Sequence, residues 1–299
     1  MTFERNLALP SSQHWISKHT AYLYLLPAVV MVAVFLLYPA AYTLYISLTN
    51  WNGLAAPKFV GIQNYIQFLK DPVFQTSFTN TLIWVVGTIT FPVLWGLGMS
   101  LLITRMRFEG AFKTIFYLPY AISATSTSVI WAFVLSPSGF INTFLHAIGL
   151  DSVARSWLIS PPWNTFAMLM AYTWQTAGTN MVLFSVGLQA LPTDPIEAAK
   201  IDGANGWQSF VYVIFPLLRP ITTVVITLAV VNSFKVFDLI WVMTQGGPYR
   251  SSETLVVTMY RESFVLFNLG RGAAIASLLS LIVFVFSAVY LRQMFRRND

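Results

Sequence analysis

The stretch EAAKIDGANGWQSFVYVIFP, residues 197–216, lies between two long apolar segments and sets the plan of the chain. Directly before it, Asp194 is expected to be the N-cap of a helix, with Pro195 at the first helical position and Glu197 at the third. Gly203 predicts the end of this helix, because glycine readily adopts the left-handed conformation that closes many helices. A plain connector needs only a few residues, so we expect a rigid helix–turn–helix element here.

The second half of the stretch predicts another helical piece, which begins at Asn205 and Gly206. Apolar residues follow at helical spacing, and Pro216 is expected to end the piece before the next apolar segment. The first piece presents mostly small side chains that would let another surface approach closely: Ala198, Ala199, Ile201 and Ala204.

The composition of the whole chain indicates an integral membrane protein. Of its 299 residues, 56% are hydrophobic and only 9% are charged, whereas a soluble domain carries about 25% charged residues. Six apolar stretches have about the 20 residues that a spanning helix needs: 22–48, 80–103, 114–135, 165–191, 217–243 and 272–291. We therefore predict an all-α integral membrane protein with six transmembrane helices over residues 22–291, terminal segments 1–21 and 292–299, and a loop at 192–216.

The distribution of Lys and Arg predicts the orientation in the membrane. With both termini in the cytoplasm, ten of the 17 Lys and Arg residues lie in inside segments and six in outside segments, although the outside segments are longer. This arrangement places the loop 192–216 in the cytoplasm. It also accounts for the net charge of +6 without a nucleic-acid partner.

Several kinds of chemistry have no support in the sequence. The chain has no Cys, and its three His residues, His14, His19 and His146, are scattered, so neither a metal site nor thiol chemistry is expected. It has no GxxxxGK[ST] phosphate loop and no paired acid and base within the apolar stretches. We therefore expect no catalytic residue, no metal and no cofactor.

The loop resembles the EAA loop of permease subunits in binding-protein-dependent ABC importers. The likeness rests on Glu197-Ala198-Ala199, on Asp202-Gly203-Ala204 with its Gly four residues after the last Ala, and on Pro216. In that family the loop forms a coupling helix that inserts into a cleft of a separate ATPase. The resemblance implies a type I ABC importer permease fold, and it implies an ATPase-coupling role for these seven residues.

Other segments narrow the likeness to the sugar permeases of the maltose-type group. They are FVGIQNY and the following DPVF, the pair Asn80-Thr81, and the long segments 234–264 and 267–270. The resemblance implies a prokaryotic inner membrane importer of a di- or oligosaccharide. Its partners would be a second, homologous permease, two ATPase subunits that bind the ATP, and an extracytoplasmic solute-binding protein. Import of a polyol or a glycerol-phosphate ester by the same architecture is the alternative.

Polar residues inside the apolar stretches are the candidates for a substrate pathway. Lys235 and Asp238 are three residues apart and are expected to share a helix face; they could serve transport or simply pair locally. The weaker candidates are Trp174, Gln175, Asn180 and Asn232, since polar side chains also pack membrane helices together. An ion-coupled secondary carrier, which would need carboxylates near the bilayer centre, is the alternative from a different class.

The first outside segment predicts a short amphipathic helix. Apolar residues recur at helical spacing in it: Phe59, Ile62, Tyr65, Ile66 and Leu69. The helix could rest on the membrane surface as a cap or form a platform for an extracytoplasmic partner.

Overall fold

The computed structural model describes residues 13–104 and 106–295, and this part of the chain is almost entirely helical. The long elements are α1 (Gln13–Val32), η1 (Ala33–Leu37), α2 (Tyr38–Ser47), α4 (Pro72–Ile103), α5 (Glu109–Ala121), α6 (Ala124–Val134), α8 (Trp163–Gln189), α12 (Arg219–Ser233) and α15 (Leu269–Phe295). The short ones are β1 (Thr49–Asn50), β2 (Lys58–Phe59), α3 (Gln63–Lys70), α7 (Phe140–Ala147), η2 (Trp157–Ile159), α9 (Asp194–Ile201), α10 (Gly206–Ser209), η3 (Phe210–Ile214), α11 (Phe215–Leu217), α13 (Asp238–Thr244), α14 (Leu255–Tyr260) and η4 (Arg261–Val265).

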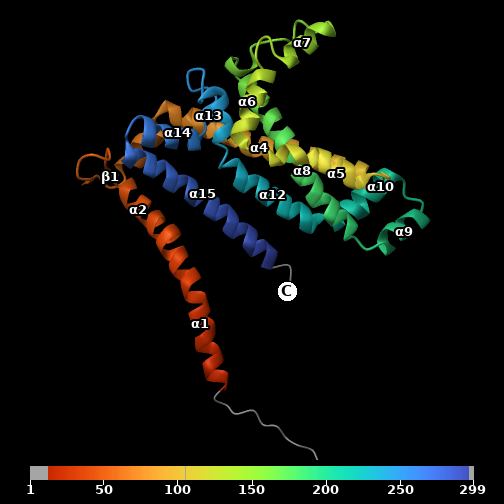
Figure 1. The fold of residues 1–299 in the computed structure, drawn as a ribbon, viewed down its shortest axis with the longest axis horizontal. Helices are drawn as coiled ribbons and strands as arrows, with labels where there is room; N and C mark the ends of the chain where they lie inside the picture. The colour runs from red at the N-terminus through yellow and green to blue at the C-terminus, as the bar shows by residue number, and fades with distance from the viewer. Residues whose placement is uncertain (1–12, 105, 296–299) are drawn as a thin grey trace, which may run out of the picture.

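The core lies where α4 and α8 pack against each other, with α5, α12 and α13 around them (Figure 1). Glycines permit the close approach. A Cβ atom added at Gly96 in α4 would lie 2.8 Å from the backbone nitrogen of Met181, and one added at Gly178 in α8 would lie 2.0 Å from the carbonyl oxygen of Phe116. Small residues at such contacts are typical of helices that pack inside a membrane.

The prediction of an all-α architecture is confirmed, whereas the helices that are long and apolar enough to count as spans are fewer than the six predicted. Among the described residues, three helical segments are long and apolar enough to cross a membrane: Tyr22–Ser47, Pro72–Ile103 and Leu269–Ala288. A fourth is possible if the bent pair Gly206–Leu217 and Arg219–Ser233, which meet at 71°, is taken as one span. α8 has 27 residues, but its polar side chains lower its hydropathy.

Two of the predicted spans are broken by local chemistry. The third is divided between α5 and α6, where Ile122 is extended and the Ser123 hydroxyl caps the new helix by accepting the backbone N–H of Ser126. The fifth is divided between α12 and α13 at residues 234–237.

The second predicted span begins eight residues earlier than expected, at Pro72. The Asp71 carboxylate accepts the backbone N–H of Val73 at 2.9 Å and so caps α4. The short helix before it, α3, is confirmed, but its buried face consists of Asn64 and Phe68. The predicted apolar stripe is mostly on the exposed side, where Ile62, Ile66 and Leu69 face outward.

The first helix stands apart from the bundle (Figure 1). In the most apolar stretch of Tyr22–Ser47 no residue is buried, whereas Ile46 and Ser47 at the end of α2 are buried and α2 packs against α15. This long apolar surface would be unfavourable in water, so it is suited to a lipid or protein environment.

Candidate functional site

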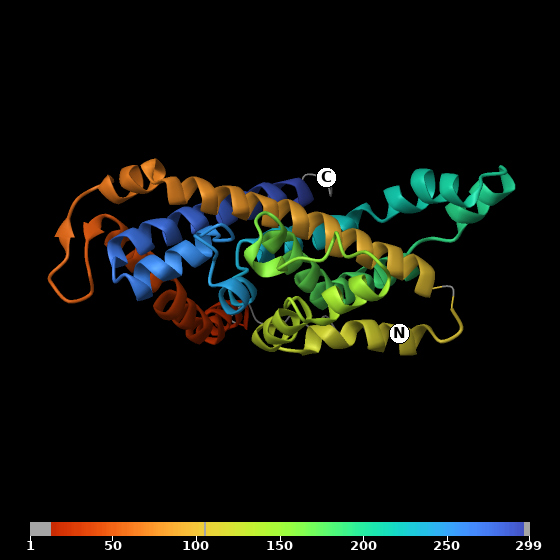
Figure 2. The same ribbon diagram turned by 90° about the horizontal axis from the view of Figure 1, so that it is seen from above.

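The segment that follows α8 forms a projecting arm, which we define as residues 192–218. Figure 2 shows α9 and α10 at one extreme of the molecule, beyond the helices of the core. No residue of α9 is buried, and three large apolar side chains of the arm are strongly exposed: Ile201 at 86%, Tyr212 at 75% and Trp207 at 72%. The arm therefore presents apolar surface that the described part of the chain does not cover.

The start of α9 differs from the prediction. Asp194 is the first helical residue rather than the N-cap, and Pro195 follows at the second position. Thr193 already has right-handed helical angles, and its carbonyl oxygen accepts the backbone N–H of Glu197 at 2.9 Å. No side chain caps this end, so the backbone alone starts the helix.

The break at Gly203 is confirmed. Gly203 has φ +80°, the N–H of Ala204 bonds to the carbonyl of Ala199 at 2.9 Å, and the N–H of Gly203 bonds to the carbonyl of Lys200 at 3.1 Å. This pair of bonds is the Schellman motif, which satisfies carbonyl groups at the end of a helix. A Cβ atom at Gly203 would meet nothing within 4 Å, so the backbone angle rather than packing requires glycine there.

The second piece of the arm begins as predicted. The Asn205 side chain accepts the backbone N–H of Gln208 and the Gln208 side chain accepts that of Asn205, both at 2.9 Å, which is a complete capping box. The predicted end at Pro216 is wrong, because this proline lies in the first turn of α11, where a missing N–H does no harm. The chain turns instead at the buried Leu218.

The structure places the predicted coupling residues together on this arm. Glu197, Ala198, Asp202 and Gly203 are exposed, Ala199 and Ala204 are half-buried, and Pro216 lies near the root of the arm. Two turns fixed by hydrogen bonds, at Gly203 and at Asn205, join α9 to α10.

The predicted pathway residues are not brought together. Gln175 is buried and donates to the carbonyl oxygen of Ile122 at 3.1 Å, at the break between α5 and α6. Asn180 is half-buried beside Gly96, and Asn232 is exposed near the end of α12.

The prediction that Lys235 and Asp238 share a helix face is wrong. Lys235 lies in the break after α12, whereas Asp238 is the first residue of α13. Both are exposed, and the described residues contain no ion pair between them. The helix that would have aligned them is interrupted at that point.

Trp174 belongs to an apolar cavity of about 590 Å³ between α4, α5, α6 and α8. Its ring is 39% exposed and meets the ring of Trp131 edge to face at 5.9 Å. Trp95 and Phe116 line the same cavity. Aromatic faces of this kind can stack on apolar faces of a ligand.

An ion network with two buried carboxylates lies at the opposite end of α8 from the arm, and sequence reasoning missed it. We define the ion network as two groups of ion pairs that meet at the consecutive residues Arg261 and Glu262: Arg250–Glu253–Arg261 and Asp71–Arg271–Glu262. Glu253 is completely buried and accepts two hydrogen bonds from Arg250, each of 2.7 Å. The hydrogen bonds with Glu253 raise the pKa of the Arg250 guanidinium above its usual value. Arg261 approaches the same carboxylate at 3.4 Å.

The rest of the network joins distant parts of the chain. Arg271 at the start of α15 donates to Asp71 at 2.9 Å and lies 3.9 Å from Glu262. Glu262 also accepts from the side chain of Asn268. By charge and position alone, these arginines are only outside charges. The sequence did contain a signal for ion pairs, because Glu253 and Glu262 lie within three residues of Arg250 and Arg261 in an otherwise apolar region.

Side chains of α4 form hydrogen bonds to the segment 251–255, which contains Glu253 of the ion network. The Asn80 amide donates to the carbonyl oxygens of Ser251 and Glu253 at 2.7 and 3.0 Å, and the Thr81 hydroxyl accepts the N–H of Leu255 at 3.0 Å. The pair Asn80-Thr81, which carried part of the resemblance, thus fixes residues 251–255 to the core.

Comparison with known proteins agrees with the architecture. A probable ABC transporter permease of Pyrococcus horikoshii is 36% identical over 272 residues, which cover 90% of this chain and 93% of that protein. A probable permease of a starch degradation products transport system, from Thermoanaerobacterium thermosulfurigenes, is 32% identical and covers 91% of this chain and 93% of its own length. The crystal structure of a bacterial ABC transporter involved in alginate import has a chain with the same fold, with a TM-score of 0.81 at 21% identity over 96% of this chain and 99% of that one.

The family assignment covers more than half of the sequence. Residues 93–298 match the family described as the binding-protein-dependent transport system inner membrane component. This segment includes the arm, the breaks around it and most of the ion network. The chain therefore belongs to the family of inner membrane permease components of binding-protein-dependent ABC transporters.

Proposed function

We propose that this chain is one permease subunit of a sugar importer and that residues 192–218 couple it to a separate ATPase. The observation that carries the proposal is the arm itself, a two-part helical projection with an exposed apolar surface. Glu197, Ala198, Ala199, Asp202, Gly203 and Ala204 would contact the ATPase, and Pro216 would lie at the root of the lever. ATP would bind only to the ATPase, since this chain has no phosphate loop.

The mechanism follows from how the arm is built. The Schellman turn at Gly203 and the capping box at Asn205 hold α9 and α10 in one arrangement. A displacement of α9 by a closing ATPase is therefore transmitted to both ends of the arm. One end continues into α8, and the other passes through the 71° bend at Leu218 into α12. These two helices line the core on which α4 packs, so the movement reaches the centre of the molecule.

A sugar is the substrate class that we favour. The support is the name of the relative from Thermoanaerobacterium, which transports starch degradation products, together with the maltose-type segments of the sequence. The aromatic cavity around Trp174 and Trp131 is suited to stacking on the apolar face of a sugar ring. Asn180, Gln175 and Asn232 stay weak candidates for the pathway, as do Lys235 and Asp238.

The assembly would place both termini and the arm in the cytoplasm. A second, homologous permease would complete the pathway, two ATPase subunits would bind the arms, and an extracytoplasmic protein would deliver the sugar. No cofactor or metal is required of this chain.

Reconstituted vesicles test this function. The chain is inserted with its partner permease, the ATPase and the solute-binding protein that are encoded beside it, and uptake of radiolabelled maltotriose and lactose is measured. Unlabelled glycerol 3-phosphate and sorbitol serve as competitors. Uptake of a sugar that needs internal ATP, the ATPase and the binding protein is the expected result. Uptake by this chain alone, driven by a proton or sodium gradient, would contradict the proposal. Strong competition by sorbitol or glycerol 3-phosphate would show that the substrate is a polyol or a phosphate ester rather than a sugar.

A further inference from the structure

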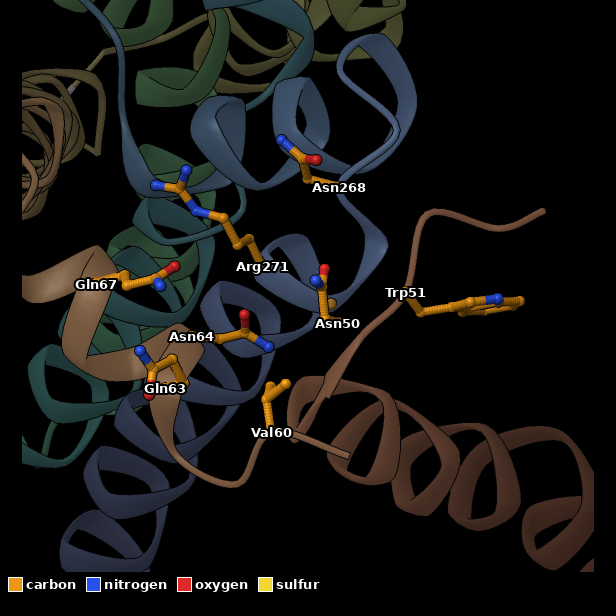
Figure 3. A pocket seen from close by; sticks show the side chains of 9 residues that line it. Asn50, Trp51, Val60, Gln63, Asn64, Gln67, Asn268 and Arg271 are labelled. Carbon is orange, nitrogen blue, oxygen red and sulfur yellow. The ribbon is translucent and has the colours of Figure 1, made fainter. Parts of the chain in front are cut away.

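A second cavity, away from the aromatic one, lies where β1, α3 and the start of α15 meet (Figure 3). Its volume is about 450 Å³, which is in the range of ligand sites in proteins. In a chain that is 56% hydrophobic, five of the nine lining residues carry a primary amide: Asn50, Gln63, Asn64, Gln67 and Asn268. We call this the amide cavity. Such side chains offer both donors and acceptors to an uncharged polar ligand.

The floor of the amide cavity is rigid. The Asn64 amide donates to the carbonyl oxygens of Ser47 and Thr49 at 2.8 and 2.9 Å. The N–H of Gly270 donates to the carbonyl oxygen of Trp51, and a Cβ atom at Gly270 would lie 2.0 Å from the carbonyl oxygen of Thr49. The cavity is therefore preformed rather than opened by a ligand.

The charge of the cavity disfavours a free anion. Its one charged lining residue, Arg271, is already compensated by the carboxylates of Asp71 and Glu262. The three arginines and three carboxylates of the whole network balance each other. The floor of the amide cavity therefore has no net positive charge with which to bind an anionic ligand.

The rim carries positive charge instead. Lys58 stands directly opposite Asn50 in the β1–β2 pair, so both side chains are on the same face of the ribbon. Lys70 follows Gln63 and Gln67 on one face of α3 at helical spacing. Both lysines are exposed, and neither has an ion-pair partner among the described residues.

A sugar ring fits this cavity less well than a peptide does. The lining contains one aromatic side chain, and Figure 3 shows that the ring of Trp51 points away from the other lining groups. Its indole N–H donates instead to the carbonyl oxygen of Ala55. Amide side chains without a stacking ring match the N–H and C=O groups of a protein loop, and the lysine rim matches acidic side chains beside that loop.

We propose that the amide cavity is a docking socket for an extended loop of the extracytoplasmic solute-binding protein, a loop that carries at least one acidic residue. This rests on the proposed function, and it follows the predicted orientation, which places residues 49–71 and 268–271 outside. The peptide groups of the loop would bond to Gln63, Gln67 and Asn268. Its acidic side chain would lie between Lys58 and Lys70.

The test uses the full importer in lipid nanodiscs with the purified solute-binding protein that is encoded beside it. The double variant Gln63→Ala/Gln67→Ala removes two exposed amides that make no hydrogen bond in the described structure, so folding is preserved. We expect the dissociation constant of the binding protein to rise by about tenfold, which corresponds to about 1.4 kcal/mol for the two lost hydrogen bonds together. The ATPase activity without binding protein should stay at the level of the unmodified importer.

A matched pair of variants tests the rim. Lys58→Gln/Lys70→Gln and the control Thr143→Glu/Ser152→Glu both make the outer surface more negative by two charges. The first pair should slow association and flatten its salt dependence, whereas the control, on exposed residues of α7 and the following loop, should not. Equal effects of the two pairs would show a general charge effect and overturn the socket.

Two further outcomes separate this proposal from the proposed function. If the binding protein stimulates the unmodified importer but binds all variants equally well, the socket is wrong and the importer function stands. If no solute-binding protein stimulates the importer, the proposed function fails first. If the amide variants instead weaken direct binding of maltotriose to the importer without binding protein, the cavity is a sugar site and the socket is wrong.

Discussion

The arm and the ion network lie at opposite ends of α8 and are held in opposite ways. The arm is exposed, and backbone hydrogen bonds with one capping box fix its shape. The ion network is centred on the buried carboxylates of Glu253 and Glu262, and charged side chains from three separated parts of the chain fix it to the core. Because α8 has 27 residues, the two regions are about 40 Å apart at 1.5 Å per residue. Under the proposed function the exposed arm would move with the ATPase, whereas the ion network would stay fixed.

This contrast predicts that the two regions respond differently to substitution. Changes in the network should lower stability, because they leave buried charges without partners. Changes in the first part of the arm should lower transport while the transmembrane part stays folded, because no residue of α9 is buried.

The largest expected effect follows from Glu253→Ala. This change removes the carboxylate that pairs with both Arg250 and Arg261. Removing one partner of a buried ion pair costs about 3–5 kcal/mol. The purified complex should unfold at a clearly lower temperature, and less of it should be recovered from membranes. Glu197→Ala on the exposed arm is the matched control and should leave the unfolding temperature unchanged. Equal unfolding temperatures for the two variants would remove the contrast between the regions.

Gly203→Leu should have the next largest effect, and on transport rather than on stability. A side chain at φ +80° disfavours the turn by about 1–2 kcal/mol, so α9 and α10 would lose their fixed angle. ATP-driven uptake should fall severely. Gly203→Asn should retain much of it, because Asn tolerates the left-handed conformation.

Gly206→Ala is the control for Gly203→Leu. Gly206 has no positive φ, and a Cβ atom there meets nothing within 4 Å. Uptake by this variant should match that of the unmodified importer. Normal uptake by Gly203→Leu would show that the turn does not matter for coupling.

Arg250→Lys tests the geometry of the network at constant charge. Lys cannot reproduce the two hydrogen bonds of 2.7 Å to Glu253, so we expect a loss of about 1–2 kcal/mol in the free energy of unfolding, less than for Glu253→Ala. Thermal unfolding of the purified complex measures it. A loss as large as that of Glu253→Ala would mean that hydrogen-bond geometry, rather than charge, holds the network.

The smallest effect is expected from Asn205→Ala, which removes the capping box at a cost of about 1 kcal/mol. Uptake should fall by only a few-fold. Thr193→Ala is its counterpart at the start of α9, where no side chain caps the helix, and it should change nothing. If Thr193→Ala were the more harmful of the two, the arm would depend on its first turn rather than on its second.

The sequence predicted the arm well because its signals are local. The Gly203 turn and the Asn205 start depend on residues a few positions apart, and both are present in the structure. The errors at Asp194 and Pro216 are also local: a proline fits the first turn of a helix as well as the residue after its end. For this reason, helix boundaries predicted from prolines can differ from the observed ones by about one turn.

The ion network could not be predicted in the same way. Asp71 and Arg271 are 200 residues apart, and Asn80 reaches a carbonyl oxygen 173 residues away. Such contacts arise from the packing of α4, α14 and α15, and a hydropathy pattern does not predict which helices pack together. The same limit explains Lys235 and Asp238, whose spacing suits a helix that the chain interrupts between them.

The most direct test of the account is whether the arm touches the ATPase. The chain contains no cysteine, so a single Ala198→Cys gives a clean site for a maleimide–benzophenone cross-linker in the reconstituted importer. Illumination should join this chain to the ATPase and stop uptake, whereas the same label at Thr143→Cys on α7 should give no ATPase adduct. An importer that shows ATP-driven uptake but no ATPase adduct from position 198 would contradict the assignment of the arm as the coupling element.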